Sequence, residues 1–173
     1  MTNLRRLNKK TIAIAASLIL AGVIVGGVAI RSVVDTAEMK AHQTAADGTS
    51  PEFRAILPQN TTISELGGWN KQTSPGGETY YDFMDSINGV AIRVSQQKLP
   101  ENFKQATDDS IAKLAKGYNA NRSFDAIGTK VYIGINTKGQ QSLIFTRDSL
   151  LVFIVSGQTV PDDAWKDYIA KLN

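Results

Sequence analysis

Few side chains of this 173-residue sequence have the type and spacing that catalysis requires. Ser110 and Lys113 have the Ser-x-x-Lys spacing of a nucleophile and its base, but the pattern places them in the middle of a helix, where no helix N-terminus would stabilise an alkoxide. The only histidine, His42, lies in a predicted linker, and the absence of cysteine excludes a thiol nucleophile and a thiolate metal site. We therefore expect no catalytic residue, no metal site and no cofactor.

Carboxylate pairs are a second source of chemistry, since two acids can act as general acid and base. None of the pairs has the dense spacing of a calcium-binding loop, and we interpret them as solvated surface charge or as favourable charges at a helix start. The pairs are Asp82 with Asp85, Asp108 with Asp109, and Asp162 with Asp163.

Aromatic residues form the best candidate cluster for contact with a ligand or partner, namely Trp69, Tyr80, Tyr81 and Phe83. If residues 79–84 form a strand, Tyr80 and Tyr81 point to opposite faces of the sheet, so one faces the core and the other faces away. The free face of a sheet lined by aromatic rings would suit a lipid, a glycan or a peptide. The alternative is that all four residues pack in the core or at its edge.

The net charge of +3 first suggests a nucleic-acid partner, but the charge is unevenly distributed. The first 44 residues carry six Lys and Arg against two acids, whereas the rest carries 13 against 14. Nucleic-acid binding needs a basic face or stripe, and the larger part of the chain has no surplus of cations from which to form one. We therefore expect no nucleic-acid partner.

Residues 11–30 form an uncharged apolar run that predicts a transmembrane helix. Its 20 residues would span about 30 Å as a helix, the thickness of the hydrocarbon core. The alternative is a cleaved signal peptide cut after Ala29, but the run exceeds the usual length of about 7–15 apolar residues. Gly22 and Gly26 form a GxxxG pair, a candidate contact between two such helices.

Four cations precede the apolar run and determine the predicted topology: Arg5, Arg6, Lys9 and Lys10. By the positive-inside rule they place residues 1–10 in the cytoplasm and the body outside it. Residues 31–52 are a stalk that ends in Asp47-Gly48-Thr49-Ser50-Pro51, where Gly and Pro stop a helix. We therefore predict a single-pass protein of the cell membrane, with the domain at residues 53–173 on the extracytoplasmic side.

Residues 53–173 contain a series of strand and helix patterns. Asn88-Gly89 predicts a hairpin turn between strands at 79–84 and 90–95. Apolar residues at three- and four-residue steps, including Phe103, Leu114 and Tyr118, predict a helix over 100–118. Further strands are expected at 124–127, 131–135, 142–146 and 150–155, and a final helix begins at Pro161. The last of these strands is almost continuously apolar, which is typical of a central strand.

These elements predict an α+β domain with an antiparallel sheet of about five to six strands. Both helices are amphipathic, and we expect them to pack on one face of the sheet, which leaves the other face free.

After an early Leu57-Pro58, the body contains in order the segments YYDFMD, GVAIRVSQQ, FDAIGTKVYIG, QQSLIFTRDSLLVFIVSG and PDDAWKDYIAKL, and the pattern covers about residues 53–172. In this order they resemble the small extracytoplasmic domains of unknown function in membrane-anchored bacterial proteins, which occur at the C-termini of some anti-sigma-factor-like proteins. The resemblance implies sensing or binding in the bacterial envelope and no catalysis. Only ten residues precede the apolar run, too few for a cytoplasmic domain that binds a sigma factor.

The sequence therefore favours a non-enzymatic, membrane-anchored domain that binds a protein, a peptide or an amphipathic ligand outside the cytoplasm. Two alternatives stay open. One is an anchored hydrolase whose Ser, Asp and Lys side chains are brought together by the fold. The other is a structural subunit of an envelope complex, which an exposed apolar patch would indicate.

Overall fold

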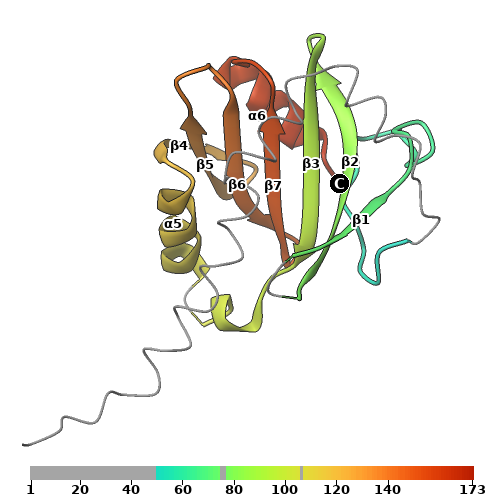
Figure 1. Cartoon of the computed structure of the whole chain (residues 1–173), viewed down its shortest axis with the longest axis horizontal. Helices are drawn as coiled ribbons and strands as arrows, with labels where there is room; N and C mark the ends of the chain where they lie inside the picture. The colour runs from blue at the N-terminus through green and yellow to red at the C-terminus, as the bar shows by residue number, and fades with distance from the viewer. Residues whose placement is uncertain (1–49, 75–76, 106) are drawn as a thin grey trace, which may run out of the picture.

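The computed structural model describes residues 50–74, 77–105 and 107–173 (Figure 1). The predicted membrane helix, its flanking cations, Gly22, Gly26 and His42 lie outside these residues, so the anchor and its topology stay predictions. Among the described residues, no helix has the length and apolar character needed to cross a membrane.

The described chain forms one open, antiparallel sheet with two α-helices, which confirms the α+β class. The sheet has seven strands, against the predicted five to six, in the order β1-β2-β3-β7-β6-β5-β4. The additional strand is the short edge strand β1, in a segment where glycines obscure the pattern. The strands are β1 (Asn70–Thr73), β2 (Thr79–Ile87), β3 (Val90–Lys98), β4 (Ala120–Ala126), β5 (Thr129–Ile135), β6 (Gln141–Arg147) and β7 (Leu150–Ser156).

The two α-helices cover opposite faces of the sheet, so the prediction that they share one face is wrong. Trp165 and Ile169 of α6 (Asp162–Lys171) pack in the main core with Val152 and Ile154 of β7. Ile111 of α5 (Thr107–Gly117) belongs to a second cluster, which Phe153 of β7 also joins. Neighbouring residues of a strand point to opposite faces, so β7, apolar along its length, needs a cover on each side. In Figure 1, α6 lies behind the sheet.

The predicted helix over 100–118 is divided in two. A 3-10 turn, η1 (Glu101–Phe103), comes first, and α5 starts only at Thr107. The Thr107 hydroxyl donates a hydrogen bond to the Phe103 carbonyl at 3.0 Å, so a side chain satisfies this acceptor. The next strand, β4, begins at Ala120, four residues earlier than the sequence pattern indicates.

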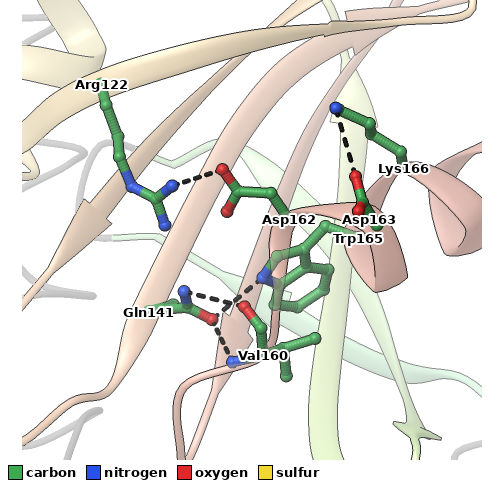
Figure 2. Close-up of polar contacts among 7 residues, drawn as sticks. All are labelled: Arg122, Gln141, Val160, Asp162, Asp163, Trp165 and Lys166. Atoms are coloured by element: carbon green, nitrogen blue, oxygen red, sulfur yellow. Dashed lines mark hydrogen bonds and ion pairs between the residues drawn. The ribbon is translucent and has the colours of Figure 1, made fainter.

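A buried glutamine fixes the start of α6 to the sheet (Figure 2). The Gln141 Oε1 accepts hydrogen bonds from the Val160 amide at 2.7 Å and the Trp165 indole at 2.9 Å, while its Nε2 donates to the Val160 carbonyl at 3.2 Å. On the surface, Arg122 of β4 pairs with Asp162 at the first turn of the helix. The three bonds of Gln141 satisfy buried polar groups, each of which would cost about 1–3 kcal/mol if it were left unpaired.

Before the sheet begins, the chain runs along the main core and meets its own last residues. The side chain of Gln96, buried in β3, accepts from the Ile56 amide at 2.9 Å and donates to the Ile56 carbonyl at 2.7 Å. Leu57 and Asn173 exchange two backbone hydrogen bonds of 2.9 Å. The first and last described segments of the body therefore lie side by side.

Candidate functional site

A mostly apolar pocket lies on the α5 face of the sheet, where the helix leaves β2, β3 and β7 only partly covered. Its volume is about 70 Å³. The apolar wall is supplied by four separate elements, because Tyr80 belongs to β2, Phe103 to η1, Leu114 to α5 and Phe153 to β7. The site is therefore an assembled one, formed by segments that are distant in the sequence.

Two aromatic rings make direct contact within the wall. The Tyr118 and Phe153 ring centroids lie 4.9 Å apart at an interplanar angle of 52°. Aromatic pairs at such distances and tilted angles contribute about 0.5–1.5 kcal/mol beyond the area they bury. This part of the pocket is therefore a preformed apolar surface.

The electrostatics of the pocket depend on a few groups. Among its described lining residues, Glu78 is the one that carries a charge, and the polar Ser95, Gln97 and Asn102 lie with it in the lining. The Glu78 carboxylate accepts from the Ser74 hydroxyl at 3.3 Å and forms no ion pair within the described residues. An exposed carboxylate therefore adjoins an apolar cavity.

The tyrosine hydroxyls of the pocket stay protonated at neutral pH. Burial raises the pKa of Tyr118, and the nearby Tyr80 raises it further. Burial also raises the pKa of Tyr80; Asp82 adds to this effect and Arg93 opposes it. Both phenols are therefore neutral groups that can donate and accept hydrogen bonds.

A second, wider hollow of about 630 Å³ adjoins the pocket. The two share Glu78, Gln97, Pro100 and Asn102. Around the shared residues the wider hollow carries charges of both signs, from Glu52, Glu101, Lys71 and Lys98. The small apolar pocket thus adjoins a broader hollow whose lining is both polar and apolar.

The four aromatic residues expected to contact a ligand do not lie together. Trp69, Tyr81 and Phe83 belong to the main core, where the Trp69 ring centroid is 5.5 Å from that of Phe83 and 6.2 Å from that of Tyr81. Tyr80 points to the other face and lines the pocket, as the alternation along the strand predicts. Tyr81 also touches the wider hollow while only 5% of its surface is exposed.

Sequence reasoning did not single out Phe103, Leu114, Tyr118 or Phe153 as binding residues. Phe103, Leu114 and Tyr118 were expected to pack against the sheet from one helix. Nothing in the pattern indicated that a pocket would remain between that helix and the sheet. Glu78 has no distinguishing signal, because its neighbours form a turn-like segment.

The residues weighed for catalysis remain apart from the pocket. The α5 residue in the pocket lining is Leu114. Ser110 and Lys113 of the same helix are not in the lining. Asp85 accepts a hydrogen bond from Tyr168 at 2.9 Å on the α6 face, whereas Asp82 is buried on the α5 face beside Asn70. Within the described ranges, no group of three or more His, Cys, Asp and Glu residues could hold a metal ion.

Comparisons with protein-family models, curated proteins and solved structures find no match for this chain. The resemblance to extracytoplasmic domains of membrane-anchored bacterial proteins therefore stays a prediction, and the function has to be inferred from the site.

Proposed function

We propose that this chain is a non-enzymatic binding protein, anchored in a membrane by residues 11–30, whose domain at residues 53–173 captures a small amphipathic ligand outside the cytoplasm. The observation that carries the proposal is the apolar pocket that adjoins a wider hollow with charged groups in its lining. Ligand sites are typically concave and largely apolar, with a few polar groups that orient the bound molecule.

The arrangement supports binding over the two alternatives from the sequence. A hydrolase would need Ser, Asp or Lys side chains near one another in a cleft, and the described lining of the apolar pocket contains neither Asp nor Lys. A structural subunit would show a continuous apolar patch. The large hydrophobic residues exposed among the described residues are Ile127, in the turn before β5, and Ile135, the last residue of β5.

A fragment screen tests the proposal. The full chain, held in solution by a non-ionic amphipol, is screened by ligand-observed NMR against small cationic, neutral and anionic fragments. We expect binding fragments that lose their signal in Leu114→Trp, which fills the pocket, and keep it in Ile135→Trp, which places the same ring on the exposed end of β5.

Thermal unfolding of both variants establishes that they are folded. The proposal is wrong if no fragment binds the wild-type chain, or if the fragments that bind are insensitive to Leu114→Trp in a folded protein.

A further inference from the structure

Aromatic rings line the pocket from several directions. Tyr80, Phe103, Tyr118 and Phe153 all contribute to its lining, and they come from different parts of the fold. The face of an aromatic ring carries partial negative charge, so a cation within about 6 Å of the ring centre is attracted to it. A small cavity lined by four aromatic rings therefore suits a positively charged group better than a purely aliphatic cavity would.

The charged residues in and near the pocket agree with this preference. Glu78, exposed and without an ion-pair partner in the described residues, is the charged group of the lining. Lys71 and Lys98 line the wider hollow and not the pocket. Asp82 and Arg93 lie near Tyr80 with opposite charges, but neither lines the pocket. Within the lining itself, a cation would therefore meet a carboxylate, whereas an anion would be repelled by it.

We propose that the pocket binds the ammonium head of a small organic cation, with the aromatic rings around the head and Glu78 beside it. This inference rests on the proposed binding function and specifies its ligand class. The neutral phenols of Tyr80 and Tyr118 supply polar contacts without adding a charge.

The size of the pocket limits how much of the ligand it encloses. An apolar cavity of about 150 Å³ holds a benzene molecule, so 70 Å³ holds roughly half as many heavy atoms. This is about three heavy atoms, so the pocket encloses part of a methylated ammonium group, and the remainder of the ligand extends into the wider hollow. The mixed charges of Glu52, Glu101, Lys71 and Lys98 there suit a polar remainder.

Three probes of nearly equal shape isolate the contribution of charge: choline, its uncharged carbon analogue tert-butylethanol, and the anion tert-butylacetate. Each is titrated into the full chain in the same amphipol, with amphipol alone as the blank. We expect choline to bind about tenfold more tightly than tert-butylethanol, and tert-butylacetate to bind most weakly.

Two matched variants assign the preference to the pocket. Glu78→Gln weakens choline binding several-fold and leaves tert-butylethanol unchanged, because only the charge is removed. Asp167→Asn removes an exposed carboxylate from α6, on the other face of the sheet and outside the lining of both hollows, and we expect it to leave all three affinities unchanged.

Equal affinities for choline and tert-butylethanol would overturn the cation proposal. The proposal would also be overturned if the preference for choline over tert-butylethanol were unchanged in both Glu78→Gln and Leu114→Trp. If none of the three probes binds while other fragments of the screen do, the ligand class is wrong and the binding function stands; if the screen is also empty, both fail.

Discussion

Tyr168 is one of the residues that connect α6 to the sheet through a polar contact. Its hydroxyl donates to the Asp85 carboxylate of β2 at 2.9 Å, while the residue itself is only 8% exposed. Burial raises the pKa of Tyr168, and the negative charge of Asp85 raises it further, because both disfavour the phenolate. The protonated tyrosine is therefore the form that the native structure requires.

This requirement predicts a loss of stability at alkaline pH. The pKa of Tyr168 is raised in the folded state, so its contribution is fully present below about pH 10, the unfolded value, and is lost as pH rises above it. In the Tyr168→Phe variant we expect unfolding to cost about 1.5–3 kcal/mol less than in the wild type at neutral pH. We expect this difference to shrink by up to about 1.4 kcal/mol per pH unit above pH 10.

Urea denaturation of both proteins across this pH range measures the difference. If the difference in unfolding free energy stays constant with pH, the pKa of Tyr168 is not raised in the folded state, and the argument is wrong.

For single residues, the sequence predicted the sheet face to which a side chain points better than it predicted which side chains line the pocket. Alternation placed Tyr80 and Tyr81 on opposite faces, and the structure agrees. The sequence could not show which face would be fully covered, because that depends on where α5 ends its contact with the sheet. Glu78 illustrates the limit, since its proposed role depends on an apolar cavity lined by residues far from it in sequence.

Among the elements, two hairpins of the sheet have the same backbone conformation but unequal sequences. The turn between β2 and β3 has Asn88 at φ 51° followed by Gly89 at φ 80°, and the turn between β4 and β5 has Ile127 at φ 49° followed by Gly128 at φ 71°. Asparagine tolerates this left-handed region, whereas a β-branched residue is strained there. Ile127 is also 55% exposed, so burial does not compensate for the strain.

The paired turns allow a reciprocal test. Ile127→Asn should stabilise the protein by about 1 kcal/mol, because it removes the strained conformation without loss of a core contact. Asn88→Ile should destabilise it by a similar amount, since it introduces the same strain at an exposed position. Chemical denaturation with an unchanged m-value measures both effects.

An Ile127→Asn variant that is less stable than the wild type would contradict the argument. It would show that the Ile127 side chain makes a stabilising contact of its own that outweighs the backbone strain.

The elements were predicted well where a local pattern determines them and less well where packing decides. The Asn88-Gly89 turn and the helix after Pro161 lie where the sequence indicates them. The placement of the helices on one face was wrong, although the evidence was present in the apolar run of β7, which is covered on both faces. The division between η1 and α5 left no mark in the apolar periodicity, which continues across both elements.

For the whole molecule, the proposed anchor predicts a defined topology. We expect a reporter fused after Asn173 to be active if it functions outside the cytoplasm and silent if it functions only in the cytoplasm, because Arg5, Arg6, Lys9 and Lys10 hold the N-terminus inside. Mass spectrometry of the mature protein should find residues 11–30 still attached. The opposite reporter pattern would refute the topology, and a mature N-terminus near Ile30 would refute the anchor.

The strand order has a consequence for the time at which the body can fold. The strands from the first half of the body, β1 to β3, join those from the second half through β7, whose Ile154 pairs with Val94 of β3. Most of the core cannot assemble until this late strand is available, and such non-local pairing is slow. If the body is exported as proposed, we expect it to stay unfolded while it is threaded through the membrane and to complete its sheet only after β7 has emerged.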